Sequence, residues 1–235
     1  MKKLQITLLS IYLGMGVYAQ QNEKTVNQGL LKVDPGTEVS TYFDFKNEST
    51  GDVLNDGSMH FYGHYQNEGL FSYTTNSRTG YVVFEGLMPE MQKIEGTSPS
   101  SFYDVLFNKS GAEHSFHLTN DIANAGTVNL MNGVVLMDKA QGGAFVFLKG
   151  AKHINTSDRS HVNGEVTKNG NEGFKYPVGD GGYYRFAGIS APAQESEIYT
   201  GDTFWKIPTA NIRMQAVQGY YRQLTIKNTG SSTKA

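Results

Sequence analysis

Residues 55–69 read Asn-Asp-Gly-Ser-Met-His-Phe-Tyr-Gly-His-Tyr-Gln-Asn-Glu-Gly, and this stretch carries the two signals that decide the fold. Between its two Asn-x-Gly triplets, the side chains alternate in character. One side of an extended chain receives Met59, Phe61 and Tyr65, and the other receives Ser58, His60, Tyr62 and His64. Because successive side chains of a strand point to opposite faces, residues 58–65 are predicted to form a strand with one buried face.

The same short pattern recurs along the chain. It is found in residues 115–119 and 127–130, and residues 144–148 are apolar on both faces. No stretch shows a sustained helical stripe, and each of the 27 glycines would cost about 1 kcal/mol inside a helix. The chain is therefore predicted to be all-β.

Turn signals separate these strands. Asn-x-Gly occurs at residues 27–29, 55–57, 67–69 and 124–126, and Asn-Gly begins at Asn132, Asn163 and Asn169. Asn and Gly tolerate positive φ and favour turns. One architecture that fits is a parallel β-solenoid, like a right-handed β-helix, in which outward Asn and Gly mark the corners of stacked coils. An antiparallel β-sandwich with hairpin turns also fits, and the turn spacing leaves both open.

The composition excludes several kinds of site. The chain has no cysteine, which removes disulfides, thiol nucleophiles and cysteine-ligated metals. Its 20 basic and 22 acidic side chains give a net charge of -2, and the basic residues are scattered. Nucleic-acid binding needs clustered lysine and arginine. We therefore expect no nucleic-acid partner, and no motif in the sequence indicates a cofactor.

The first 19 residues have the layout of a secretory signal peptide. Lys2 and Lys3 precede an apolar stretch at residues 4–19, which ends in Ala19. That stretch is shorter than the roughly 20 apolar residues that cross a bilayer. Cleavage after Ala19 is predicted, with no membrane span left in the mature chain. The protein is expected to be secreted, either extracellular or associated with the outer-membrane surface.

The mature chain divides into three parts. Residues 20–192 are predicted to form the solenoid-like module, and residues 193–200 are polar and are predicted to be a linker. Residues 201–235 contain two strand-like segments and are interpreted as an incomplete β unit or a truncated following domain. An uncapped solenoid end exposes unpaired edge groups, so end-to-end association is also expected.

Longer motifs run through residues 20–192. They include Asn27-x-Gly-Leu-Leu-Lys-Val, Gly80-Tyr-Val-Val-Phe84-Glu-Gly86, Phe102-Tyr103-Asp104-Val105-Leu106-Phe107-Asn108, His161-Val162-Asn163-Gly164 and Phe174-Lys-Tyr176-Pro177-Val178-Gly179-Asp180. Together they resemble the amino-terminal, β-rich region of large exported surface proteins of gliding Bacteroidota, the gliding-motility-associated, type IX-secreted adhesin-like proteins. The resemblance implies a solenoid-like extracellular region with a role in adhesion or gliding and no known reaction. It favours the solenoid over the sandwich.

Longer members of that family end in a C-terminal domain for sorting and surface attachment. This sequence ends at Ala235 without one. The expectation is a truncated reading frame or an isolated amino-terminal module.

Two weak candidates for metal binding can be named. His60 and His64 would share one strand face, but about 7 Å apart, which is long for chelation without a third ligand. Asp180 lies in a glycine-rich stretch where calcium could bind, but calcium needs six to eight oxygen ligands and Asp180 is alone. A solvated polar face and a tight turn, with Gly179, Gly181 and Gly182 at positive φ, are the favoured interpretations, so no metal site is predicted.

Aromatic residues give the best indication of a binding surface. Outward tyrosines at strand spacing can stack on sugar rings or on a partner's side chains. The candidates are Tyr62, Tyr65 and Tyr73, while Phe61 and Phe71 are expected in the core.

Three functions follow from these features. The leading prediction is a non-enzymatic, exported structural or adhesion module whose partners are surface polysaccharides or other surface proteins. The second is a carbohydrate-binding module. The third, a β-helix polysaccharide lyase, needs a Lys or Arg base beside a carboxylate-bound metal, and no local sequence shows that arrangement. No catalytic residue is therefore predicted.

Overall fold

The computed structural model describes residues 23–87, 89–109, 115–137, 142–180, 182–191, 198–206 and 221–228. The predicted signal peptide at residues 1–19 lies outside these ranges. The elements found within them are all strands, so the all-β prediction is confirmed. No helix long and apolar enough to cross a membrane is present among the described residues.

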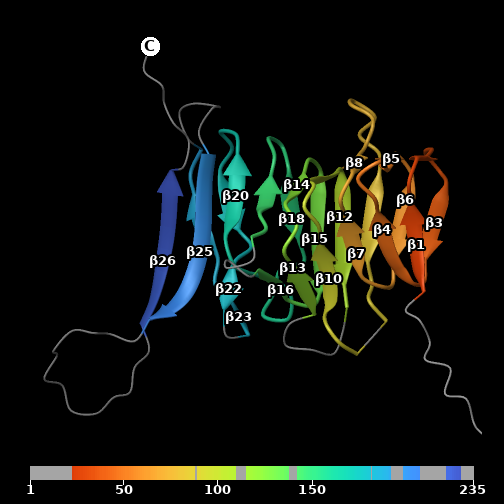
Figure 1. Cartoon of the computed structure of the whole chain (residues 1–235). Coiled ribbons are helices and arrows are strands. Elements are labelled where there is room, and N and C mark those ends of the chain that lie inside the picture. Colours follow the sequence, from red (N-terminus) through yellow and green to blue (C-terminus); the bar gives the residue numbers. More distant parts are fainter. Residues whose placement is uncertain are drawn as a thin grey trace, which may run out of the picture.

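Three sheets form the sides of a β-solenoid of about six turns (Figure 1). The first sheet contains β1 (Lys24–Asn27), β4 (Asp44–Asn47), β7 (Tyr65–Asn67), β10 (Gln92–Glu95), β13 (Phe116–Leu118), β16 (Val135–Met137) and β19 (Val162–Asn163). The second contains β2 (Leu30–Val33), β5 (Asp52–Asn55), β8 (Leu70–Ser72), β11 (Ser100–Phe102), β14 (Ile122–Asn124), β17 (Phe145–Phe147) and β20 (Val166–Asn169). The third contains β3 (Glu38–Thr41), β6 (Ser58–Phe61), β9 (Tyr81–Phe84), β12 (Asp104–Asn108), β15 (Thr127–Asn132) and β18 (Lys152–Ile154).

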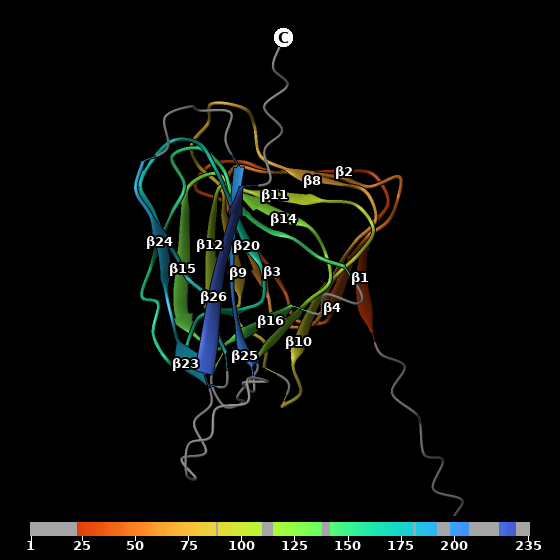
Figure 2. The same ribbon diagram turned by 90° about the vertical axis from the view of Figure 1, so that its left-hand side faces the viewer.

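Each coil contributes one strand to each sheet, and strands of successive coils pair in parallel. Phe45 of β4 pairs with Tyr65 of β7, so a coil without an insertion takes about 20 residues. Figure 2 looks along the stack and shows the three sheets enclosing a common interior. The solenoid prediction is confirmed, because the Asn and Gly turns join strands of different sheets and do not close antiparallel hairpins.

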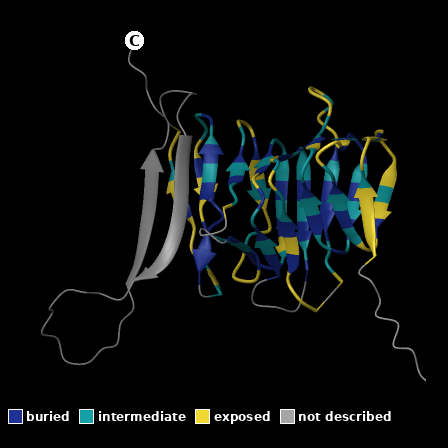
Figure 3. Ribbon diagram, in the orientation of Figure 1, coloured by how far each residue is buried: buried dark blue, intermediate teal, exposed yellow. Residues whose placement is uncertain are grey.

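The interior is filled by columns of side chains that repeat from coil to coil. Phe61, Phe84 and Phe107 occupy equivalent positions of β6, β9 and β12. Their rings stack with centroids 5.6 Å and 5.5 Å apart, and all three are fully buried. Figure 3 shows buried residues recurring in the strands along the stack. Burial of each ring stabilises the fold by about 1.5–3 kcal/mol. The core is therefore continuous along the axis of the solenoid.

Several asparagines at or near the corners point inward, which corrects for these residues the expectation that they face outward. Asn47, Asn67, Asn120 and Asn124 are all completely buried. Each donates from its side chain to a backbone carbonyl of another residue, as Asn67 does to Ser98 at 3.0 Å and Asn124 to Val146 of β17 at 3.1 Å. The inward amides therefore satisfy backbone carbonyls that are at least partly shielded from water.

Residues 58–65 form two strands instead of the single one predicted. β6 ends at Phe61, and the chain turns at Tyr62 and Gly63 before β7 starts at Tyr65. A Cβ at Gly63 would lie 2.6 Å from the backbone nitrogen of Asp44 in the preceding coil, so only glycine fits this corner. The alternating pattern is unbroken across the turn because Tyr65 also faces the core.

The segment at residues 144–148 is also simpler than predicted. In β17, Phe145 and Phe147 are buried, whereas Val146 between them is only half-buried. One face of this strand therefore lines the core, as in its neighbours.

Short antiparallel strands follow the last coil. β21 (Phe174–Tyr176) pairs with β24 (Ala187–Ile189), and β22 (Gly179–Asp180) pairs with β23 (Tyr183–Tyr184). They replace the regular parallel coil at this end of the stack.

The second sheet continues beyond β20 in antiparallel fashion. β25 (Ile198–Lys206) pairs with β20, and β26 (Tyr221–Asn228) pairs with β25. β25 begins inside the predicted linker, so residues 198–200 belong to a strand, and residues 193–197 lie outside the described ranges. The two strands expected in residues 201–235 are present, and they extend the solenoid's own sheet.

Candidate functional site

A hollow lies on one corner of the solenoid. It lies where the second sheet turns into the third, and its volume is about 290 Å³. Its walls come from β8, from the loop at residues 73–80 and from the next coil at β11. The lining residues are Ser72, Tyr73, Thr75, Asn76, Arg78, Ser101 and Tyr103. We call this the tyrosine pocket.

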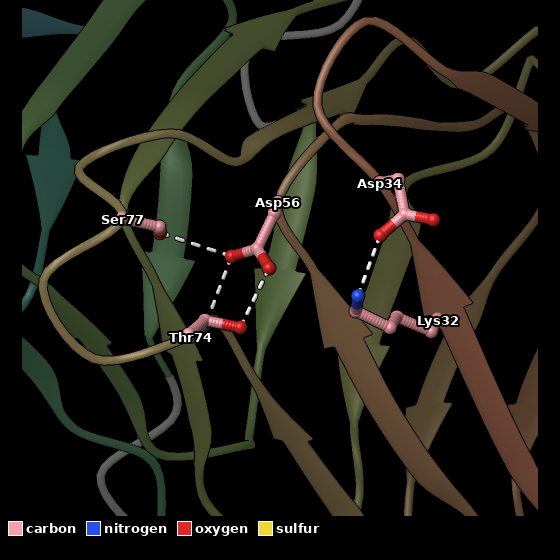
Figure 4. A network of polar contacts seen from close by, with 5 residues as sticks. All are labelled: Lys32, Asp34, Asp56, Thr74 and Ser77. Atoms are coloured by element: carbon pink, nitrogen blue, oxygen red, sulfur yellow. Dashed lines mark hydrogen bonds and ion pairs between the residues drawn. The ribbon is translucent and has the colours of Figure 1, made fainter.

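The loop at residues 73–80 is held in place by one buried carboxylate. Asp56 accepts a hydrogen bond from the backbone N–H of Thr74 at 2.8 Å, and others from the hydroxyls of Thr74 at 2.6 Å and of Ser77 at 2.9 Å (Figure 4). Three donors on one carboxylate fix both ends of the segment that carries Thr75 and Asn76. The outer wall of the tyrosine pocket is therefore tied to the coil beneath it.

The electrostatics of Asp56 agree with this anchoring role. Burial alone would raise the pKa of Asp56, but the hydrogen bonds from Thr74 and Ser77 and the charge of Lys32 together lower it below its usual value. Lys32 itself is paired with Asp34 at 2.6 Å, beside the same network (Figure 4). Asp56 therefore stays ionised at neutral pH and continues to accept from the loop.

Two tyrosines from successive coils form the floor of the pocket. The rings of Tyr73 and Tyr103 lie 5.6 Å apart at an interplanar angle of 67°. Burial and the neighbouring Tyr103 raise the pKa of Tyr73, so its hydroxyl stays protonated and can donate as well as accept. Ring faces, hydroxyls, an amide and one guanidinium therefore meet around a single hollow, a combination that suits a polar ligand with an apolar face.

A second exposed group lies at the corner between the third and first sheets. Tyr42, Phe43 and Leu87 are 70%, 48% and 56% exposed, and Tyr62 lies among them. The rings of Tyr42 and Tyr62 are 5.8 Å apart on successive coils, and the N–H of Leu87 donates to the carbonyl of Tyr62 at 3.2 Å. We call these four residues the aromatic corner.

The predicted ligand-binding tyrosines fall in three different places. Tyr62 lies in the aromatic corner and Tyr73 lines the tyrosine pocket. Tyr65 was wrongly predicted: it is fully buried, its hydroxyl is 2.8 Å from Oγ of Ser100, and burial raises its pKa strongly. Its position on the apolar side of the alternating pattern was the signal for this. Phe61 and Phe71 are in the core, as expected.

The two histidines do not share a face. His60 lies in β6, with its ring 6.4 Å from that of Tyr62, and His64 follows the turn into the first sheet. Nδ1 of His64 accepts from the backbone N–H of Lys93 at 3.1 Å. The prediction of a common face was wrong because the chain turns at Gly63. No group of three or more His, Asp or Glu side chains suited to a metal ion occurs in the described part of the chain.

Asp180 lies in the tight turn that was favoured for it. It is buried, and it pairs with Tyr183 across the hairpin of β22 and β23, where Gly182 has a φ of 74°. Gly179 serves a different purpose from the one predicted: its φ is not positive, and a Cβ there would meet the ring of His161 at 2.6 Å. Gly181 lies outside the described residues.

Sequence reasoning missed several residues of these two surfaces. Tyr103 and Arg78 join Tyr73 only because successive coils stack and the loop at residues 73–80 lines the same hollow as Ser101 of β11. Tyr42 could have been found, because it precedes Tyr62 by one coil of about 20 residues. Comparison of the chain with protein-family models, with curated proteins and with solved structures finds no match.

Proposed function

We propose that the protein is a non-enzymatic, exported module that mediates adhesion or assembly at the cell surface or in the extracellular space. The observation that carries this proposal is the aromatic corner. The rings of Tyr42 and Tyr62 lie 5.8 Å apart on successive coils, tilted by 43°, with Phe43 and Leu87 exposed beside them. A contiguous group of exposed apolar side chains is typical of an interaction site. Its partners would be surface polysaccharides or other surface proteins.

The solenoid supports this role through its rigidity. Parallel pairing in three sheets and a continuous core keep corner residues in register over several coils. A flexible loop would have to order these rings on binding, which costs conformational entropy, whereas here they are already aligned. The motifs that resemble exported surface proteins of gliding Bacteroidota agree with the proposal.

The test has two parts. Mass spectrometry of the exported protein should find Gln20 as its first residue, and an intact residue 1 in a cell-associated form would argue against export. Binding of the labelled protein to intact cells should then fall in the variant Tyr42→Ser/Tyr62→Ser. The control is Val26→Ser, which changes another exposed apolar residue, 47% exposed, outside the aromatic corner. Equal binding by the two variants would remove the aromatic corner as the adhesive surface.

A second candidate function, carbohydrate binding, is favoured by the tyrosine pocket. Tyr73 and Tyr103 offer ring faces, and Asn76, Ser72 and Ser101 offer hydrogen-bonding groups at the same hollow. Sugars present C–H faces that pack on aromatic rings and hydroxyls that need polar partners. On an array of immobilised glycans, binding that is lost in Tyr73→Ala and in Tyr103→Ala would support this function.

The polysaccharide-lyase alternative gains no support from this pocket. None of its lining side chains is a carboxylate that could hold a metal ion, and the nearby Asp56 is occupied by Thr74 and Ser77. We therefore treat the tyrosine pocket as a binding site.

A further inference from the structure

We propose that the tyrosine pocket is specific for an acidic sugar, a uronic acid residue whose carboxylate pairs with the guanidinium of Arg78. This inference rests on the carbohydrate-binding function proposed above and adds the chemical class of the ligand.

Charge gives the first argument. Arg78 is the one charged side chain among the lining residues, and it is exposed to the hollow and to solvent. Among the described residues it forms no ion pair. A planar guanidinium binds a carboxylate through two parallel hydrogen bonds, so a ligand carboxylate is the partner that this group selects. The chain as a whole carries a net charge of -2, so this local positive charge does not reflect a generally basic surface.

The carboxylate that anchors the loop is already engaged elsewhere. Asp56 lies behind the loop, where Thr74 and Ser77 supply it with three hydrogen bonds between 2.6 Å and 2.9 Å (Figure 4). The carboxylate of Asp56 therefore anchors the loop that forms the outer wall of the tyrosine pocket. The guanidinium of Arg78 is left for a ligand.

The position of Arg78 is set before any ligand binds. The residue adopts a φ of 50° and Asn76 a φ of 70°, both in the left-handed region that is rare for residues other than glycine. Such conformations persist where the surroundings impose them, and they gather at binding and active sites. At the end of the same loop, Gly80 lies so close to the carbonyl of Asn55 that a Cβ would clash there. The loop is therefore fixed at both ends, with Arg78 between the two attachments.

Tyr73 and Tyr103 supply the other contacts that suit the pocket to a sugar. Their rings are inclined at 67°, so a ligand that packs its C–H face on one ring places its edge near the other. Because Tyr73 stays protonated, its hydroxyl can donate to a sugar oxygen. The volume of about 290 Å³ lies at the lower end of the range for small-molecule sites, which suits one sugar ring of a chain or a chain end.

The experiment is calorimetric titration of the full chain with two probes of equal length. One is a trimer of galacturonic acid, and the other is the neutral trimer of galactose. We expect the acidic trimer to bind about tenfold more tightly or better, since a charge-assisted pair contributes more than a neutral hydrogen bond. In Arg78→Gln this preference should vanish, and Arg78→Lys should restore only part of it because lysine cannot bind a carboxylate through a planar fork.

The matched control is Arg159→Gln, which removes an exposed arginine far from the pocket lining and has the same effect on net charge. It should bind both trimers as the unmodified chain does. An equal loss in Arg159→Gln and Arg78→Gln would show a non-specific charge effect and overturn the inference.

The remaining outcomes separate the two proposals. If both trimers bind equally and only Tyr73→Ala abolishes binding, the protein binds carbohydrate but Arg78 does not select acidic sugars. If neither trimer binds, and no glycan on the array does, the carbohydrate-binding function fails together with its specificity. Unchanged melting temperatures of the variants would confirm that each still folds.

Discussion

The side-chain amide of Asn47 donates to Oδ1 of Asn67 across 2.8 Å, and this bond joins two successive coils inside the protein. Asn27 donates in the same way to Asn47, and Asn67 continues the line to Oγ of Ser100 at 3.1 Å. Ser100 in turn donates to Asn120 at 2.9 Å. A line of hydrogen-bonded polar side chains, the polar ladder, therefore runs along one corner, parallel to the columns of phenylalanine. Each member donates a side-chain hydrogen bond to the next.

Breaking the middle of this ladder should be costly. Asn67→Ala takes the side-chain donor from the carbonyl of Pro99 and one of the two side-chain donors from that of Ser98, and it removes one of the acceptors of Asn47. We expect a loss of about 2–4 kcal/mol in the free energy of unfolding, since each unsatisfied buried group costs about 1–3 kcal/mol. Urea denaturation measures this loss. Asn27→Ala, at the end of the ladder in the first coil, is the control and should cost less than half as much, whereas equal losses would contradict the argument.

The close approach of successive coils leads to a second prediction. Gly29 and Gly69 are both the third residue of an Asn-x-Gly triplet, and neither has positive φ. A Cβ at Gly69 would meet backbone oxygens of Gly51 and Glu48 in the preceding coil, whereas one at Gly29 would meet nothing within 4 Å. Gly69→Ala should lower the free energy of unfolding by about 2 kcal/mol or more, because overpacking typically destabilises a fold by this amount.

Gly29→Ala is the natural control, because the first coil has no coil before it among the described residues. Its melting temperature should be unchanged or slightly raised, since alanine restricts the unfolded chain. Equal destabilisation by the two substitutions would mean that the triplet itself, and not the stacking, requires glycine.

The third prediction concerns acid stability near the last coil. Nε2 of His153 lies 2.6 Å from the carbonyl of Lys175, and Nδ1 lies 2.7 Å from the hydroxyl of Thr156. Burial lowers the pKa of His153, and the charge of Lys175 adds to this, although the bond to its carbonyl acts in the opposite direction. Because the pKa in the folded state is below that in the unfolded chain, the unfolded state binds this proton first as the pH falls.

The contribution of neutral His153 to the free energy of unfolding should therefore be fully present above about pH 6.5. It should decline as the pH falls from there toward the pKa of His153 in the folded state. Thermal denaturation at about pH 7.5 and at about pH 5.5 checks this, with a loss of at most about 1.4 kcal/mol per pH unit from one group. His153→Gln keeps a neutral hydrogen-bond donor, so its free energy of unfolding should fall less between the two pH values. If the two proteins lose stability equally, His153 is not responsible.

A fourth prediction concerns the C-terminal edge of the second sheet. β25 pairs with β20 from Val166 opposite Gly201 to Asn169 opposite Ile198. A chain that ends at Ala191 would lack this pairing and expose the edge of β20, and exposed edges recruit other strands. Light scattering should show that the shortened chain associates more with rising concentration than the full chain does. A shortened chain that stays monomeric wherever the full chain does would contradict it.

The sequence by itself determined the class of fold and much of its core. Alternation at Met59 and Phe61, and short strands such as residues 127–130, predicted strands with one buried face, because the two-residue period is a local property of extended chain. The asparagines and glycines located the corners, since their tolerance of tight turns is also local. The sequence left open whether those corners stack in parallel or close hairpins.

Tertiary structure alone decided what the corners and the surfaces do. Asn47 faces inward because its amide finds carbonyls of neighbouring coils, and His60 and His64 separate because Gly63 must lie against the coil before it. The tyrosine pocket joins Tyr73, Arg78 and Tyr103 across two coils of unequal length. Such contacts depend on the register between coils and on the size of the insertions. Both are set by the packing of residues far apart in the sequence, so they leave no periodic signal in it.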